Sequence, residues 1–249
     1  MGICPDATLV DITHEIGPQD VLGGALELAA AYKYFPPATV FLCVVDPGVG
    51  SNRRGIAAGA GGYRFVAPDN GLLTTVLRET PPERVVELTN RQYARPSISA
   101  TFEGRDRFAP AAAWLATGVP LDALGTQLTA WETLDIPEPN IAGDELMAVV
   151  LRVDRFGNLV TNIDRRTFDA FADAKDVQIA AGAHRIASVV RTYAEVEDGA
   201  LCALFGSSDH LEVAVNGGSA ADRLQGSRGM SISVRLRSEL TGSSRRVRR

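Results

Sequence analysis

Asp46, Arg53 and Arg54 are the residues whose types and spacing first suggest chemistry in this chain. Asp46 directly follows the apolar run 40–45, and a turn rich in proline and glycine separates it from the two arginines. A carboxylate beside a guanidinium at the end of a strand can orient and deprotonate water. An aspartate that caps its turn and pairs with a surface arginine explains the same residues. Both interpretations stay open at this point.

Further carboxylates follow other predicted strands and loops. Asp69 stands in the turn sequence 68–71, and Glu103 and Asp106 belong to a group of four charges in residues 103–107, directly before an apolar helix. Turn formation and a salt-bridged helix cap account for these residues without any catalytic role. Taken with Asp46 and Arg53, they also make a set of carboxylates and arginines that can activate water.

Other chemistries are disfavoured by the motifs. Gly48 and Gly50 begin a dinucleotide-binding pattern, but Arg53 replaces its third glycine, and the chain has no Gly-Lys-Ser/Thr phosphate loop. It also has no Gly-x-Ser-x-Gly sequence, and no cysteine–histidine pair stands out. Asp11 and His14 are one conceivable metal pair, but with three histidines in total we expect no metal site. A glycosidase pair lacks an obvious aromatic sugar platform.

Composition narrows the class of protein. A net charge of -5 over 249 residues argues against nucleic acid or an anionic membrane as a partner. The three cysteines are far apart in apolar sequence, which predicts reduced thiols and a cytoplasmic protein. No apolar run reaches the length that would span a membrane.

Residues 1–136 are predicted to form an α/β domain with a mostly parallel sheet and flanking helices. Because residues 40–45 are apolar and β-branched throughout, they are expected to form a central strand that is buried on both faces. Asp20 is a predicted N-cap for the first helix. The predicted strands are 7–12, 40–45, 55–61, 63–67 and 85–88, and the predicted helices are 21–34, 72–79 and 109–117.

The second half of the chain has a different pattern. Two prolines in residues 137–143 indicate a linker, and residues 144–238 contain short strands separated by turns, which predicts a small β-barrel domain. The Ser/Arg-rich residues 239–249 are expected to be a disordered basic tail. The predicted strands of this half are 146–153, 177–179, 186–190, 201–205, 211–215 and 230–236.

Five sequence motifs, in this order, resemble one family. They are FPPATVFLCVVDPGVGSNRRGIA, FVAPDNGLLTTVL, TFEGRDRFAPAAAWLATG, VDRFGNLVTNI and GSSDHLEVAVNGGSAADRL, and the match runs from about Cys4 to Leu236. The chain is similar to the S-adenosyl-L-methionine (SAM) hydroxide adenosyltransferases, the adenosine-forming SAM hydrolases that are related to fluorinases and chlorinases. The resemblance implies an N-terminal α/β domain, a C-terminal β-barrel and a homotrimer that binds SAM at its subunit interfaces.

The resemblance also implies an activity and a set of residues. Water displaces methionine from the ribose C5′ of SAM, which is the substrate, and neither a metal nor another cofactor is required. Motif matching places two members of the water-handling set on Asp46 and Arg53. Fluorinases have tyrosine where Asp46 stands, and a carboxylate repels halide, so halogenation is disfavoured. Asp154 and Ser207 would hold the methionine end, and adenine would lie among Phe156, Asn158, Tyr193, Asn216 and Gly217.

Two departures from the family pattern leave alternatives open. Glu103 stands where the family has the histidine of its water-handling set. The family's first strand and the aspartate loop that follows it have no counterpart here, which suggests an N-terminally truncated sequence. The leading hypothesis is SAM hydrolysis with Asp46, Arg53 and Glu103 as catalytic residues. A catalytically silent subunit that binds SAM or adenosine is the alternative, and a generic carboxylate hydrolase ranks third.

Overall fold

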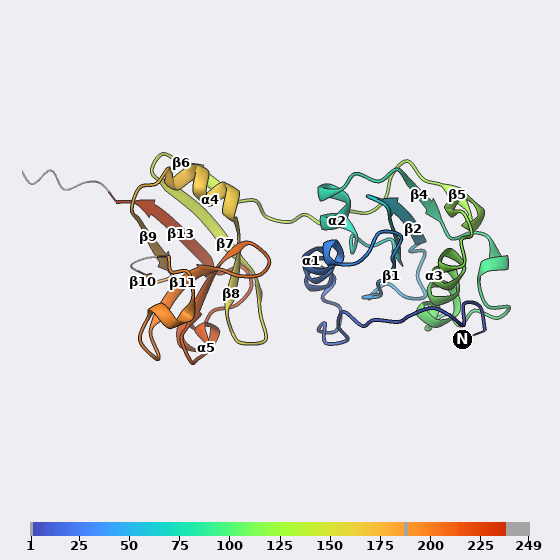
Figure 1. Cartoon of the computed structure of the whole chain (residues 1–249), viewed down its shortest axis with the longest axis horizontal. Coiled ribbons are helices and arrows are strands. Elements are labelled where there is room, and N and C mark those ends of the chain that lie inside the picture. The colour runs from blue at the N-terminus through green and yellow to red at the C-terminus, as the bar shows by residue number, and fades with distance from the viewer. Residues whose placement is uncertain (1, 187–188, 238–249) are drawn as a thin grey trace, which may run out of the picture. The chain divides into compact units, whose positions relative to one another are not determined.

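The computed structural model describes residues 2–186 and 189–237. The chain divides into two compact units, Met1–Asp135 and Ile136–Arg249, beside the predicted domain boundary (Figure 1). The predicted basic tail, residues 239–249, lies outside the described residues. None of the helices in the described part of the chain combines the length and the apolar character needed to span a membrane.

The first unit contains a five-stranded sheet between helices. Its strand order is β1-β3-β2-β4-β5, and β1 runs parallel to β3 while the other neighbouring pairs are antiparallel. The strands are β1 (Val40–Leu42), β2 (Gly55–Ala60), β3 (Tyr63–Pro68), β4 (Arg84–Glu87) and β5 (Thr126–Gln127), and the helices are α1 (Val21–Ala31), α2 (Thr74–Glu79) and α3 (Ala109–Ala116).

The α/β class is confirmed, but the sheet is mixed rather than mostly parallel. Gly61 and Gly62 both have positive φ, +58° and +81°, and form a two-residue turn that returns the chain directly from β2 to β3. Such a hairpin makes the two strands antiparallel, whereas parallel neighbours need a long crossover. Tight turn chemistry therefore decided the strand direction.

Strand β1 lies at the edge of the sheet, which corrects the prediction of a central strand. Leu42 is 46% exposed, and in the described residues β1 pairs with β3 alone. Residues 7–12 are not a strand, and Leu9 and Val10 are largely exposed. This segment has no neighbouring strand among the described residues, so its apolar sequence alone does not make it a strand.

Alternating side chains of β2 and β3 build two cores, one on each face of the sheet. Ile56 and Phe65 pack with α1 and α2, while Ala57 and Val66 face the cluster that contains α3 (Figure 1). This period-2 alternation is the pattern of strands that are covered on both faces. Helix α1 begins as predicted at Asp20, whose side chain accepts a hydrogen bond from the Gly23 backbone N–H.

The second unit is a strongly curved antiparallel sheet with order β10-β9-β13-β7-β8-β12-β11, and β6 pairs with β7. Val189 bridges to Ala203 in β11, so the two ends of the sheet approach each other and the barrel is nearly closed. The elements are β6 (Asn140–Ala142), β7 (Glu145–Val153), β8 (Leu159–Asp164), α4 (Arg165–Ala172), β9 (Val177–Ala181), β10 (His184–Ile186), β11 (Leu201–Phe205), β12 (His210–Val215), α5 (Ala220–Leu224) and β13 (Ser231–Leu236).

The predicted β-barrel is confirmed, with local corrections to its elements. Residues 140–142 of the predicted linker form β6, because their backbone pairs with the start of β7. Strand β8 was not predicted, because Thr161 and Asn162 interrupt its apolar pattern. Both side chains are buried and hydrogen-bonded, Thr161 to the Leu211 carbonyl and Asn162 to the Pro137 carbonyl. Tertiary partners thus allow polar residues inside this strand.

The two-sided core of the first unit can be tested at Phe65, which is fully buried and stacks on Phe41 at a centroid distance of 5.1 Å. We expect Phe65→Ala to lower the free energy of unfolding of this unit by about 3–5 kcal/mol, because it removes contacts and leaves a cavity. Both tryptophans, Trp114 and Trp131, lie in this unit, so their fluorescence in urea follows its unfolding.

Tyr34→Ala is the control, because Tyr34 is 81% exposed. We expect it to change the free energy of unfolding by less than about 0.5 kcal/mol. An equal loss of unfolding free energy in Phe65→Ala and Tyr34→Ala would contradict the described core.

Candidate active site

Asp46, Arg53 and Glu103 come together in the first unit. The Nη2 atom of Arg53 donates to Asp46 Oδ2 at 2.7 Å and to Glu103 Oε2 at 2.6 Å. The three side chains are 7%, 7% and 11% exposed. One guanidinium thus joins two largely buried carboxylates from segments that lie far apart in the sequence, as the sequence interpretation of Asp46 and Arg53 as a pair requires.

One carboxylate oxygen of Asp46 is not used in these hydrogen bonds. Asp46 Oδ1 is buried and has no hydrogen-bond partner among the described residues, and the same holds for Arg53 Nε. Burial raises the pKa of Asp46 and the charge of Glu103 raises it further, while Arg53 opposes both effects. A buried carboxylate with a raised pKa and a free oxygen is suited to accept a proton from a small molecule.

Backbone contacts fix the loop that carries Asp46. After β1 the chain stays beside β3, because the Cys43 N–H donates to the Val66 carbonyl at 2.9 Å, and Asn70 Nδ2 donates to the Val45 carbonyl at 2.8 Å. Gly50 has φ +80°, and a β-carbon there would lie 2.8 Å from the Ala100 carbonyl oxygen. Glycine at this position therefore lets the Asp46 loop approach the segment that leads to Glu103.

Glu103 begins an irregular helical turn. Residues Gly104–Phe108 form a π-helical turn directly before α3, a rare conformation that is frequent at functional sites. The Phe108 ring lies under the Arg53 guanidinium, with 5.2 Å between Arg53 Cζ and the ring centroid. A β-carbon at Gly55 would lie 2.5 Å from this ring. The start of β2, the aromatic ring and the guanidinium are thus stacked closely.

The other predicted carboxylates have structural partners. Asp69 accepts hydrogen bonds from Arg54 Nε and from the Glu132 N–H, both at 2.8 Å. Asp106 is bound by Arg105 and by the Ser99 N–H, which together lower its pKa. Both aspartates are buried. They stabilise the loops around the cluster, as the turn and cap interpretation predicts.

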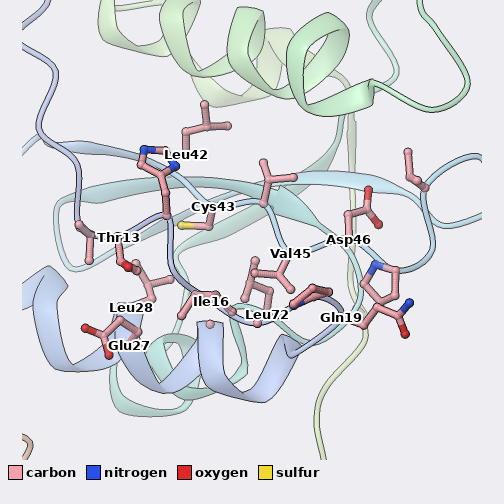
Figure 2. Close-up of a pocket in the computed structure, with 18 residues that line it drawn as sticks. Thr13, Ile16, Gln19, Glu27, Leu28, Leu42, Cys43, Val45, Asp46 and Leu72 are labelled. Carbon is pink, nitrogen blue, oxygen red and sulfur yellow. The ribbon is translucent and has the colours of Figure 1, made fainter. Parts of the chain in front are cut away.

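Asp46 also lies at one end of a cavity of about 570 Å³. In Figure 2 the labelled side chains run from Asp46 through Val45 and Cys43 to Leu42, with Leu28 of α1 on the opposite wall. Burial raises the pKa of the Cys43 thiol to about 12, so this cysteine stays protonated at neutral pH. Asp46 is therefore the group with the stronger case for acid–base chemistry at this end of the cavity.

Asp11 and His14 approach each other to 3.2 Å at the protein surface. Over residues 2–186 and 189–237, no group of three or more His, Cys, Asp or Glu side chains is arranged to hold a metal ion.

In the second unit, four of the residues implied by the resemblance form one network. Asp154 Oδ1 accepts from the backbone N–H groups of Phe156 and Asn158, both at 2.8 Å. Asn158 Nδ2 donates to Asp154 Oδ2 at 2.9 Å and to the Tyr193 hydroxyl at 3.2 Å. The loop after β7 is therefore held rigidly, and it presents Phe156 with 78% of the residue exposed.

The remaining predicted binding residues lie at strand ends of the same unit. Ser207 is exposed just after β11, and Asn216 follows β12 and donates from Nδ2 to the Val196 carbonyl at 2.9 Å. Gly217 has φ +70°, and a β-carbon there would lie 2.3 Å from Asp198 Oδ1. A side chain at Gly217 would therefore strain the backbone and collide with Asp198.

Two charged residues near these sites were not predicted. Glu212 is 7% exposed in β12; burial and the nearby charge of Asp154 raise its pKa. The sequence feature that could have revealed Glu212 is a carboxylate among the apolar residues of this strand. Arg107 approaches Glu103 at 3.4 Å between Nη2 and Oε1, and the signal was its i,i+4 spacing on a helical turn.

Comparison with known proteins places these residues in a family. The model for the SAM hydroxide adenosyltransferase N-terminal domain matches residues 1–125, and the model for the C-terminal domain of the same family matches residues 148–233. The chain belongs to the SAM hydroxide adenosyltransferase family. The N-terminal model covers the cluster of Asp46, Arg53 and Glu103, and the C-terminal model covers the Asp154 network. Both groups of residues therefore lie in domains of this family.

Individual relatives agree with this assignment. An (R)-S-adenosyl-L-methionine hydrolase of Thermus thermophilus is 40% identical over 236 residues, which cover 92% of this chain and 88% of that protein. A fluorinase of Actinoplanes sp. is 33% identical over 192 residues, which cover 66% of this chain and 64% of the fluorinase. A solved structure of a Thermotoga maritima protein matches with a TM-score of 0.86 and 37% identity, over 94% of this chain and 90% of that one.

Removal of Arg53 tests the electrostatics of the cluster. We expect Arg53→Met to lower the free energy of unfolding by about 3–5 kcal/mol at pH 7, because it leaves two buried carboxylates without their shared cation. The loss of unfolding free energy shrinks as the pH falls, because the raised pKa of Asp46 rises further without Arg53 and protonation of Asp46 removes its repulsion of Glu103. Urea unfolding followed by tryptophan fluorescence at pH 5 and pH 7 measures both effects.

Arg84→Met serves as the matched control, because Arg84 pairs with the exposed Asp122 at the surface. We expect this substitution to change the free energy of unfolding by less than about 1 kcal/mol, with little dependence on pH. A loss for Arg53→Met that grows towards low pH would contradict the described arrangement.

Proposed function

We propose that this protein hydrolyses SAM to adenosine and L-methionine, with Asp46, Arg53 and Glu103 as the residues that handle water. The observation that carries the proposal is the buried cluster, in which Asp46 keeps one oxygen free for a small molecule. Relatives named (R)-S-adenosyl-L-methionine hydrolase, 40% identical over most of the chain, give the substrate.

In the proposed reaction water attacks the ribose C5′ as the bond from C5′ to sulfur breaks. The bonding electron pair goes to sulfur, which becomes the neutral thioether of methionine, and Asp46 Oδ1 accepts the proton that water loses. Arg53 orients Asp46 and balances its charge through the 2.7 Å hydrogen bond. Because the sulfonium charge disappears during attack, a site that excludes water favours the reaction. The anionic Asp46 also repels halide ions, which favours water as the nucleophile.

The second unit supplies the proposed substrate contacts. Asp154 and Ser207 bind the amino and carboxylate ends of methionine, and Phe156 offers an exposed ring for adenine to stack on. Asn158, Tyr193, Asn216 and Gly217 complete the adenine site, and the Asp154–Asn158–Tyr193 hydrogen bonds support a preorganised loop. No metal or other cofactor takes part in this proposal.

The proposal includes a cytoplasmic homotrimer whose SAM sites lie at subunit interfaces. A ring as exposed as Phe156 gains from being covered by a ligand or a neighbouring subunit. We expect sedimentation equilibrium to give about three times the chain mass of 26.5 kDa. A monomer at micromolar concentration would contradict the trimer. It would not contradict hydrolysis, which has a separate test.

The activity test is the release of both products. We expect the purified protein to convert SAM to adenosine and L-methionine in equal amounts, as measured by chromatography. Asp46→Asn should lower kcat by about 10²–10⁴-fold, because an amide does not accept the proton of water. Calorimetry should show that this variant still binds SAM.

Asp122→Asn is the control, because Asp122 forms a surface ion pair with Arg84, and its kcat should equal that of the wild type. SAM binding without any adenosine would contradict hydrolysis. That outcome would favour the alternative, a silent SAM-binding or adenosine-binding subunit, which the unusual Glu103 supports. In that case Glu103→His should create activity.

A further inference from the structure

Arg107 contacts the carboxylate cluster from its outer side. Its Nη2 atom lies 3.4 Å from Glu103 Oε1, while Glu103 Oε2 accepts from Arg53 Nη2 at 2.6 Å. Each oxygen of Glu103 therefore faces a different guanidinium. Asp46, in contrast, has a cation on one oxygen and no partner on the other among the described residues.

Packing limits where Arg107 can go. It belongs to the π-helical turn Gly104–Phe108, and its Cδ would lie 3.3 Å from a β-carbon at Gly55. Its side chain is 27% exposed, so the stem is packed while the guanidinium partly reaches solvent. The turn thus holds a positive charge one helical turn beyond Glu103.

The charges of the four side chains balance. Asp46 and Glu103 contribute two negative charges, and Arg53 and Arg107 contribute two positive ones. Without Arg107 the cluster would carry a net negative charge in a largely buried place, which favours protonation of one carboxylate. Arg107 therefore affects which protonation state the pair adopts.

We propose that Arg107 is a positioning residue that holds Glu103 against Arg53, so that Glu103 is a fixed counter-charge and Asp46 alone accepts the proton from water. This rests on the proposed hydrolysis. Both oxygens of Glu103 face a guanidinium in this arrangement, whereas Asp46 Oδ1 has no hydrogen-bond partner among the described residues. The negative charge of Glu103 in turn adds to the effect of burial in raising the pKa of Asp46.

Other charged groups near the cluster are identifiable. Arg54, next to Arg53, is bound to Asp69. Arg107 lines a cavity of about 220 Å³ together with Glu87, Arg91 and Tyr93, and Cys43 lies beside Asp46 in the larger cavity. Glu87 is the carboxylate that lines this cavity together with Arg107, so Glu87→Gln belongs in the experiment as a comparison.

The experiment measures kcat and KM for SAM between pH 4.5 and 8.5 in the wild type and in Arg107→Gln. We expect the acidic limb of the kcat profile to move about one unit to higher pH in the variant, because removal of a positive neighbour makes the carboxylate pair hold its proton more tightly. At pH values on that limb kcat falls about tenfold, and KM changes less than about twofold. Arg107→Lys keeps the charge and should restore the wild-type limb.

A double-mutant cycle separates positioning from general structure. In a Glu103→Gln background, Arg107→Gln should shift the limb no further, because the charge on which it acts is gone. Arg84→Gln is the control for loss of a surface arginine, and Glu87→Gln should leave the limb in place. If Arg107→Gln moves the acidic limb of the kcat profile as far in the Glu103→Gln background as in the wild type, the proposal is overturned.

A readout without turnover separates this proposal from the proposed function. Carboxyl ¹³C NMR titration of Asp46 should show the same upward shift in Arg107→Gln, in protein without SAM. If the wild type does not hydrolyse SAM but the titration shifts, the proposed function fails and the role of Arg107 stands. If the wild type hydrolyses SAM and neither the titration nor the pH profile of a folded Arg107→Gln variant differs from wild type, the role of Arg107 is wrong.

Discussion

The site depends on one guanidinium that holds two largely buried carboxylates. Arg53 joins Asp46 and Glu103 through a single nitrogen, and each carboxylate would be costly to bury without it. The loop after β1 and the turn before α3 have to meet for this contact to form. Gly50 and Gly55 permit the close approach of these segments, because neither has a side chain in the way. The Phe108 ring packs against the Arg53 guanidinium where the segments meet.

The two carboxylates of the cluster are chemically similar but differently placed. Glu103 is bound at both oxygens by cations, while Asp46 retains a free buried oxygen and a raised pKa. Environment rather than residue type thus distinguishes a counter-charge from a proton acceptor. Arg107 approaches the second oxygen of Glu103 and adds a positive charge beside the carboxylate pair.

In the barrel unit, hydrogen bonds order the loop that follows β7. Asp154 binds the backbone of its own loop and orients Asn158, which contacts Tyr193. Such a loop is ordered before any ligand arrives, which lowers the entropy cost of binding. Glu212, a buried carboxylate in β12, lies near enough to Asp154 for the two carboxylates to interact, and this interaction adds to the effect of burial in raising the pKa of Glu212.

The sequence by itself determined the α/β class, the β-barrel, the family and the pairing of Asp46 with Arg53, because strand patterns and motif spacings are local. It was wrong about a mostly parallel sheet and about the central place of β1, because strand partners are chosen by tertiary contacts. The roles of Asp69 and Asp106 were equally undecided until their partners were known. Only the tertiary structure placed Glu103 on Arg53 and Arg107 on Glu103, since burial and distance decide which charges act together.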